Sequence, residues 1–201
     1  MNAARTKGLD GRSARRHDTK LLILGAATEL FALRGVTATS MDDIAEHAGI
    51  AKGSLYYNFS SKSGLVEALM AQSVSTLRAS IDSAMEGLTG RAARQAVIAA
   101  VLAEMQRNPN AARLMAAEVF RTDRDWRTTT QAWREVMMTP LAAGLMADDP
   151  AMTVDTAAVR AAAIVGATLM AGLEWMMFRP ELPYKDVLAA ALTAIDLTCP
   201  Q

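Results

Sequence analysis

Apolar residues recur every three or four positions along nearly the whole chain, and this spacing constrains the fold more than any other feature. One face of an amphipathic helix is marked by Ile23, Ala27, Leu30 and Phe31. Runs of β-branched residues with period two, which a half-buried strand requires, are absent. The composition is 51% hydrophobic and includes 13 methionines. We therefore predict an all-α fold with almost no strand.

Glycine and proline residues divide this helical pattern into segments. A first helix from Asp18 is stopped by Gly35, a short second helix ends at Gly49, and a third spans residues 52–58. A long helix then runs from residue 65 to the glycines at 87 and 90. Further helices are predicted over 91–107, 110–122, 125–146, 154–178 and 184–198, with Pro140 kinking or ending its helix.

The single cysteine and the lack of a leader pattern indicate a soluble cytoplasmic protein. Cys199 leaves no partner for a disulfide within the chain. The basic residues near the start are not followed by the apolar stretch of about 7–15 residues that a secretory signal needs. No stretch is predicted to span a membrane, because 161–178 contains Glu174 and ends at Arg179.

Charge is balanced over the chain but uneven along it. Residues 1–62 contain nine Lys or Arg and six Asp or Glu, whereas residues 63–201 contain 12 and 15. The first third therefore carries the charge that a phosphate backbone attracts. Residues 1–17 are polar and Arg-rich and contain two glycines, so we predict a flexible basic arm that either follows the minor groove of DNA or stays solvated.

Two short helices joined by a glycine turn follow this arm. Thr39 and Ser40 offer an N-cap, and Asp42 and Asp43 lie in the first turn, where the helix dipole favours acids. The third helix buries its apolar stripe and begins about three residues after Gly49. This arrangement is a helix-turn-helix, and we assign it to a domain of residues 18–64.

The residues of this segment occur in a specific order. The order is an Ile-Ala pair at 44–45, an Ala-Gly turn at 48–49, Lys-Gly-Ser at 52–54, Leu-Tyr-Tyr at 55–57 and finally Phe59 and Lys62. The stretch closely resembles the DNA-binding signature of the tetracycline-repressor (TetR) family over about residues 18–70. Ala51 stands where the family often has Ser or Thr, and Asn58 where it often has His.

The second helix of a helix-turn-helix enters the major groove, so the residues opposite its buried stripe are the candidates for meeting base edges. These are Lys52, Ser54 and Tyr57, with Gly53 allowing close backbone approach. By resemblance, Tyr56 and Tyr57 present hydroxyls to the DNA and Lys62 clamps a phosphate. The cap at Thr39 and Ser40 offers a further phosphate site, and Asn58 completes the candidate set. The alternative is that the tyrosines pack against the first helix and that Lys52 is merely solvated.

Residues 65–201 are predicted to form a helical domain for ligand sensing and dimerisation, as the resemblance implies. The candidate ligand-binding residues are Met105, Met115, Phe120, Trp126, Trp133, Met137, Met170, Glu174 and Trp175. Thioethers and aromatic rings can line an adaptable apolar cavity, although each of these residues is equally consistent with ordinary core. Glu174 has three interpretations: pairing with a cationic ligand, pairing with a buried arginine, or facing solvent.

The last two predicted helices are rich in small residues, which let helix backbones approach closely. In the TetR family the corresponding pair forms a four-helix bundle with its copy, so a homodimer is expected. The resulting hypothesis is a repressor that binds a near-palindromic DNA operator and is released by a small apolar or amphipathic effector.

Two other classes of function were weighed against this one. Neither metal-ligand spacing, nor a phosphate loop, nor a Ser-His-Asp grouping is evident, so no enzyme, cofactor or metal is predicted. An adaptor that binds protein through its helix-turn-helix is the third class. Salt-dependent DNA binding separates a repressor from both.

Overall fold

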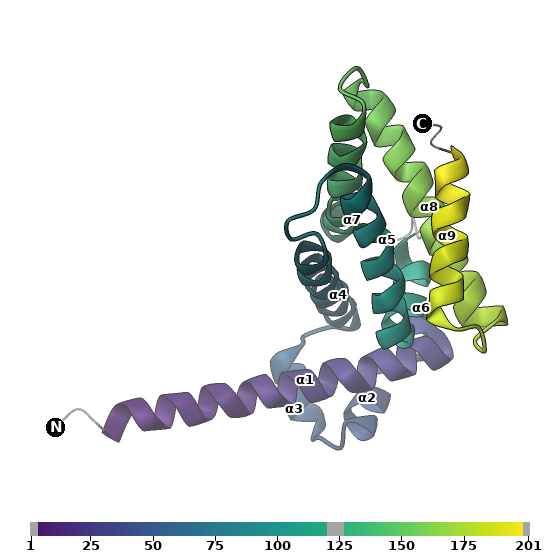
Figure 1. Ribbon diagram of the computed structural model, residues 1–201. Helices are drawn as coiled ribbons and strands as arrows, with labels where there is room; N and C mark the ends of the chain where they lie inside the picture. Colours follow the sequence, from purple (N-terminus) through teal and green to yellow (C-terminus); the bar gives the residue numbers. More distant parts are fainter. Residues whose placement is uncertain (1–3, 120–126, 199–201) are drawn as a thin grey trace. The chain divides into compact units, whose positions relative to one another are not determined.

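The computed structural model describes the backbone of residues 4–119 and 127–198 and the side chains of residues 18–117 and 131–195. Every element in these ranges is an α-helix, which confirms the predicted all-α class (Figure 1). The chain divides into two compact units, Met1–Met70 and Ala71–Gln201. The boundary lies within a helix, a few residues after the predicted domain boundary at residue 64.

The first unit is built from α1 (Ala4–Ala38), α2 (Met41–His47), α3 (Lys52–Asn58) and the start of α4 (Lys62–Ala84). Gly35 has a φ of 78° and a ψ of 158°, so the regular part of α1 ends there, as predicted. The apolar stripes of these helices meet in one core. Its fully buried members include Ile23, Ala27, Ile44, Leu55, Leu65 and Val66.

The backbone of residues 4–17 is helical and continues into α1, which corrects the predicted flexible arm. The prediction rested on polarity and on two glycines. However, adding residues to an existing helix gains a hydrogen bond per residue without the cost of a new nucleus, and alanine, arginine and lysine favour this state.

The start of α4 contains Gly64, a weak helix former. Ser61 offsets this weakness, because its Oγ accepts a hydrogen bond from the Gly64 amide at 3.1 Å. A serine three residues before an amide in the first turn is an N-cap. The helix therefore begins cleanly at Lys62 and extends over 23 residues into the second unit.

The second unit contains the rest of α4 together with α5 (Gly90–Arg107), α6 (Pro109–Val119), α7 (Arg127–Asp148), α8 (Val154–Phe178) and α9 (Tyr184–Thr198). These bounds agree with the predicted helices to within a few residues. Pro109 opens α6, where its missing N–H costs nothing. Pro140 lies inside α7, which continues to Asp148, so this proline does not end its helix.

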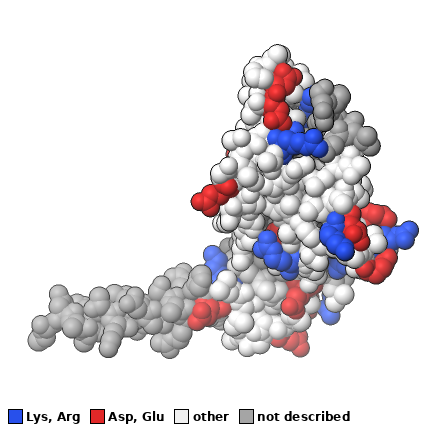
Figure 2. Space-filling view, viewed as in Figure 1, with Lys and Arg blue, Asp and Glu red and all other residues white. Residues whose placement is uncertain are grey.

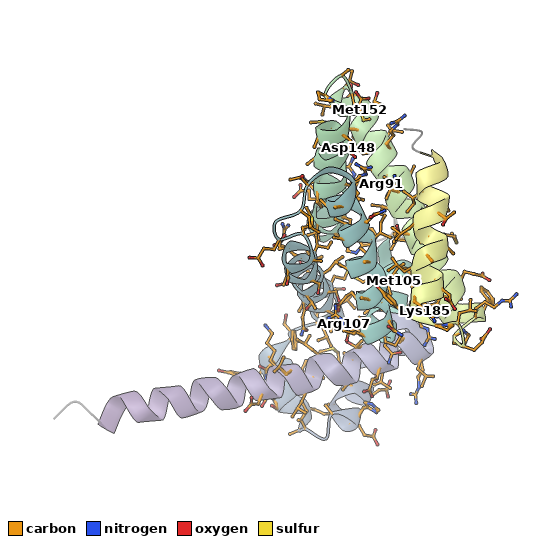
Figure 3. All side chains as sticks on the ribbon, in the orientation of Figure 1. Arg91, Met105, Arg107, Asp148, Met152 and Lys185 are labelled. Carbon is orange, nitrogen blue, oxygen red and sulfur yellow. The ribbon has the colours of Figure 1, made fainter. Side chains whose placement is uncertain are left out.

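The core of the second unit lies between α5, α7, α8 and α9, with one face of α4 packed against it. Leu102, Met137 and Leu141 are almost completely buried in it. Met105 of α5 lies against Gly172 of α8, where a side chain larger than hydrogen would collide with the Met105 thioether (Figure 3). The Met105 side chain therefore fills the space over Gly172, and the flexible end of that side chain would have to move for a larger residue.

A buried arginine joins the beginning of α5 to the end of α7. Arg94 is 8% exposed, donates a hydrogen bond to the Gly144 carbonyl at 2.9 Å and forms an ion pair with Asp148. Its guanidinium thereby donates to a carbonyl near the C-terminal end of α7 and neutralises the charge of the Asp148 carboxylate. Figure 3 shows Asp148 at this end of the bundle.

Two helices, Asp18–Ala38 and Val154–Phe178, are long and apolar enough to cross a membrane by length and composition alone. The expectation that no stretch is long enough is therefore wrong for α8. Core helices of soluble proteins pass the same test, and α8 contributes Ile164, Val165 and Trp175 to the core of the second unit. Packing within the unit thus covers one side of α8, and 33% of its apolar window is buried.

The close contact at Gly144 gives a test of this packing. A Cβ added there would lie 2.7 Å from the Arg94 Cγ and 3.0 Å from the Gly90 carbonyl oxygen. We expect Gly144→Ala to lower the free energy of unfolding by about 1–3 kcal/mol, because the backbone must shift to make room. Urea denaturation measures it, and Ala143→Ser, one added atom at an exposed neighbour, should change it by less than about 0.5 kcal/mol. Equal effects of the two substitutions would contradict this account.

Candidate nucleic-acid interface

The turn between α2 and α3 sets the geometry of the helix-turn-helix. Gly49 has a φ of 65°, the left-handed conformation that glycine adopts without strain. Its amide donates a hydrogen bond to the Glu46 carbonyl at 3.0 Å. The next amide, that of Ile50, bonds the Ala45 carbonyl at 3.0 Å. These bonds close α2 and redirect the chain into α3 within a few residues, as predicted.

A reciprocal cap fixes the beginning of α2. The Asp43 amide donates to the Ser40 Oγ at 3.0 Å, and the Ser40 amide donates to the Asp43 carboxylate at 2.8 Å. This capping box confirms Ser40 as the N-cap. The hydrogen bond from the Ser40 backbone lowers the pKa of the Asp43 carboxyl below its ordinary value. The cap therefore contributes stability at neutral pH and loses it as the solution is acidified through that lowered pKa.

Burial of one side of α3 determines which side faces outward. Leu55 is 0% exposed, and Phe59, which follows one turn later, is 7% exposed. The Lys20 ammonium of α1 lies 5.7 Å from the centre of the Phe59 ring, a cation–π distance. The predicted inward stripe is thus confirmed, and the opposite side of α3 is left on the surface.

Four of the predicted DNA-contacting residues share this outer side. Lys52, Gly53, Tyr56 and Tyr57 are exposed, with Tyr57 at 71%, and Ser54 is half-buried beside them. No atom lies within 4 Å of a Cβ built on Gly53, apart from its own helix backbone and chain neighbours, so a flat partner has unobstructed access to this backbone. The tyrosines are therefore not core residues, in contrast to the alternative weighed above.

Lys52 makes a contact that no motif in the sequence indicates. Its Nζ lies 2.6 Å from the Asp42 Oδ2 on α2. The hydrogen bond with Asp42 raises the pKa of the Lys52 ammonium above its ordinary value. The two residues are ten positions apart and on different helices, so helical periodicity gives no signal for the pair.

The remaining polar candidates are engaged within the domain. Thr39 is 1% exposed and donates to the Gly35 carbonyl at 2.9 Å, so its hydroxyl is engaged inside the unit. The hydroxyl satisfies a carbonyl left over where α1 ends. The Asn58 amide donates to the Ser54 carbonyl one turn earlier at 2.9 Å and is half-buried.

Lys62 also has partners inside the domain. Its ammonium donates to the Thr39 carbonyl at 2.8 Å and to the Thr37 carbonyl at 3.2 Å. A lysine that binds carbonyls at a helix C-terminus is a favourable cap for both charge and hydrogen bonding. Lys62 therefore holds α4 to the end of α1, a role that the predicted phosphate clamp did not include.

The helix-turn-helix itself is not basic. Residues 18–62 contain four Lys or Arg and five Asp or Glu, so the excess positive charge of the first third resides in residues 1–17. The described surface of the first unit accordingly shows acidic and basic side chains close to one another in Figure 2. Any phosphate attraction of the first unit must therefore draw mainly on residues 1–17.

Comparison with known proteins agrees with this geometry. Residues 23–69, which include α2, α3 and parts of the flanking helices, match the model of the family described as bacterial regulatory proteins, tetR family. Over this segment the chain is similar to the TetR family.

Relatives and solved structures extend the comparison. The chain is 45% identical over 60 residues to the transcriptional repressor KstR2 of Rhodococcus jostii (strain RHA1), which covers 30% of this chain and 28% of that protein. It is 29% identical over 121 residues to the regulator UidR of Escherichia coli (strain K12), covering 53% and 62%. The matched parts thus span less than two thirds of these relatives.

Among solved structures, FadR from Bacillus subtilis in complex with stearoyl-CoA superimposes with a TM-score of 0.74. The match covers 87% of this chain and 96% of that one at 17% identity, which shows a common fold. These three proteins are named as regulators or repressors, which agrees with the prediction that the chain is not an enzyme.

The predicted ligand-binding residues are dispersed. Met105, Met115, Met137 and Trp175 are buried, and Trp133 is partly buried against the core. Met170 and Glu174 are exposed on α8, so they do not line the interior. The two remaining candidates, Phe120 and Trp126, lie outside the described residues. A cavity beside Met137 has a volume of only about 10 Å³, less than a water molecule needs, so the core there is filled by its own side chains.

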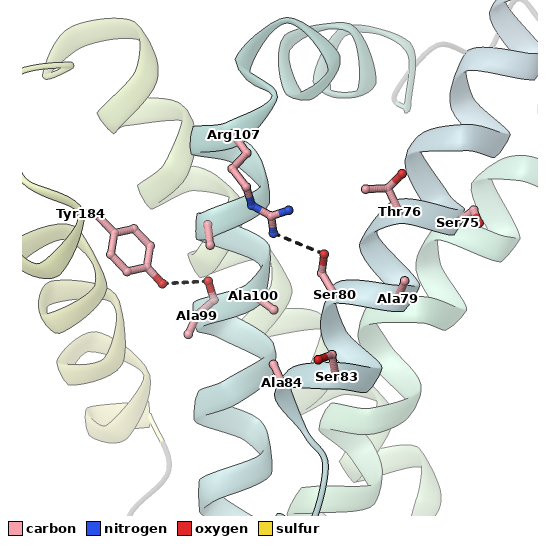
Figure 4. Close-up of a pocket in the computed structure, with 11 residues that line it drawn as sticks. Ser75, Thr76, Ala79, Ser80, Ser83, Ala84, Ala99, Ala100, Arg107 and Tyr184 are labelled. Atoms are coloured by element: carbon pink, nitrogen blue, oxygen red, sulfur yellow. Dashed lines mark hydrogen bonds between the residues drawn. The ribbon is translucent and has the colours of Figure 1, made fainter. Parts of the chain in front are cut away.

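An open groove lies elsewhere in the second unit, between α4 and α5, and has a volume of about 800 Å³. Figure 4 shows Arg107 reaching across it from α5 to the Ser80 hydroxyl of α4, a hydrogen bond of 3.3 Å. Arg107 also pairs with Glu104 at 2.9 Å. The rest of the wall consists of small and hydroxyl-bearing residues: Ser75, Thr76, Ala79, Ser83, Ala84, Ala99, Ala100 and Ala103, with Tyr184 at the edge. Neither sequence periodicity nor residue type had pointed to this groove.

The contacts of Lys62 give a prediction for the first unit. We expect Lys62→Ala to lower the free energy of unfolding by about 0.5–1.5 kcal/mol, because two carbonyls at the end of α1 lose their donor. Thermal denaturation measures this loss. Glu67→Ala, at an exposed position on the same helix, is the control and should cost less. An unchanged midpoint for Lys62→Ala would show that the two hydrogen bonds do not stabilise the junction.

Proposed function

We propose that this protein is a cytoplasmic transcriptional repressor that binds a DNA operator through the exposed side of α3. The observation that carries the proposal is the outward-facing set of Lys52, Gly53, Tyr56 and Tyr57 on a helix whose other side is anchored by Leu55. A short helix held in this way can enter the major groove and present its N-terminal residues to base edges. The named regulators to which the chain is similar support the same reading.

Gly53 tests the proposal without disturbing the fold. We expect Gly53→Ala to leave the stability unchanged or raised by up to about 1 kcal/mol, because alanine is the better helix former and no other part of the protein lies near the added methyl. Affinity for operator DNA should nevertheless fall by about tenfold or more, since the methyl keeps the α3 backbone from the bases.

The measurement begins with selection of bound sequences from random DNA, followed by titration of the preferred site over a series of salt concentrations. Gly25→Ala is the matched control, because Gly25 is also an exposed helical glycine with open space around its Cβ position. A stable Gly53→Ala variant that binds as tightly as the wild type would refute the proposed docking.

We also propose that the protein acts as a homodimer formed through α8 and α9. Exposed apolar residues recur at helical spacing along α8, at Val159, Ala163, Gly166, Ala167 and Met170, and the exposed Glu174 separates them from Met177. Val159 is 71% and Met170 66% exposed, which is unusual for a continuous stripe on a monomer. A second copy would cover this stripe and place two α3 helices about 34–36 Å apart, or at a multiple of a helical turn, on a near-palindromic site.

A charge on the stripe tests the dimer. We expect Met170→Lys to raise the dimer dissociation constant by more than about tenfold, because twofold symmetry places two unpaired charges in the interface. Sedimentation equilibrium measures the constant. Leu33→Lys makes the same apolar-to-lysine change at a residue of α1 that is 77% exposed, and it should leave the dimer dissociation constant unaltered. A wild-type monomer at micromolar concentration would contradict the proposal.

The second unit is proposed to bind an apolar or amphipathic effector that releases DNA. The groove between α4 and α5 supports this, since its volume falls within the range of small-molecule sites and Arg107 offers a donor to an anionic group. The stearoyl-CoA bound by FadR is a ligand of this amphipathic kind. We expect fatty acids or their CoA thioesters to lower operator affinity in a fluorescence polarisation titration, and Arg107→Gln to weaken that response. An unchanged affinity across both classes would exclude them as effectors.

A further inference from the structure

The ion pair between Lys52 and Asp42 lies on the surface that the proposed function assigns to DNA. The Lys52 Nζ is 2.6 Å from the Asp42 Oδ2, and the two side chains are 66% and 50% exposed. Exposed pairs of this kind contribute little to stability. The position of the pair, at the N-terminal end of the helix that faces the bases, is therefore more informative than its strength.

Asp42 is the better anchored of the two residues. It occupies the first turn of α2, which is fixed by the capping box at Ser40 and by the burial of Met41 and Ile44. Its side chain is short, whereas the lysine side chain has four rotatable bonds and loses much freedom when held in place. The carboxylate therefore determines where the ammonium is found, rather than the reverse.

We propose that Asp42 is a positioning residue for sequence reading, which holds the Lys52 ammonium toward the base edges and away from the phosphates. This inference rests on the proposed binding of DNA through α3. An ammonium has three donor hydrogens. One is engaged by Asp42. The two that remain match the two acceptors, O6 and N7, which guanine presents in the major groove.

The same contact lowers affinity for DNA without a preferred sequence. To reach a phosphate, Lys52 must leave Asp42, and the carboxylate left behind would repel the backbone of the duplex. To read a guanine, Lys52 keeps its contact and loses little further freedom. The pair thus separates the two modes of binding, and it does so through a residue that would not itself contact a base.

Asp42→Asn is the test, because it removes the charge and keeps the size of the side chain. We expect affinity for random DNA to rise about two- to fivefold at low salt, with the salt slope steeper by about 0.9, since a freed lysine neutralises one more phosphate. Affinity for the selected site should not rise, so the ratio of specific to random affinity should fall by at least about two- to fivefold. Asp42→Glu should restore most of the ratio.

Two further variants separate positioning from simple charge. Glu46→Gln removes the same charge from an exposed position on the same helix and should leave the ratio unchanged. In a Lys52→Ala background, Asp42→Asn should no longer affect the ratio. The inference is overturned if Asp42→Asn leaves the ratio of specific to random affinity unaltered. It is also overturned if Asp42→Asn changes that ratio equally in the Lys52→Ala background. A wild-type protein that prefers no DNA sequence would overturn the proposed function, and the inference with it.

Discussion

The proposed DNA-contacting face of α3 depends on the burial of Leu55. A helix of seven residues has no stability of its own in water, because the cost of its nucleus exceeds the gain of so few hydrogen bonds. Leu55 and Phe59 supply the missing free energy by entering the core of the first unit. The same burial fixes the rotation of α3, and with it the side on which Lys52, Gly53 and the tyrosines lie.

Features that arise within a few residues of one another could be predicted from the sequence, whereas contacts between distant segments could not. Helical periodicity gave the bounds of the helices, and Gly35 and Gly49 gave their ends, because a positive φ is a local property. The cap at Ser40 spans only three residues. By contrast, Lys62 donates to carbonyls 23 and 25 residues earlier in the chain. The family motif assigns this lysine to a phosphate and does not indicate these two hydrogen bonds.

Charge separates the two tasks of a DNA-binding unit. Residues 18–62, which provide the reading face, have no excess of basic residues, and residues 1–17 contain five Lys or Arg against one Asp. Attraction to the phosphate backbone is independent of sequence, whereas contacts to base edges are not. A division of this kind, with general attraction in the N-terminal segment and recognition in α3, keeps excess charge away from the residues that must discriminate between bases.

The helix α4 contributes residues to both units. This single helix of 23 residues crosses the unit boundary at Met70. Its first residue, Lys62, holds the end of α1, and Ser80 near its other end accepts a hydrogen bond from Arg107 across the open groove. A ligand that engages Arg107 competes with the Ser80 contact and frees that part of α4. Under the proposed function, this competition at Ser80 is how an effector in the groove would act on α4.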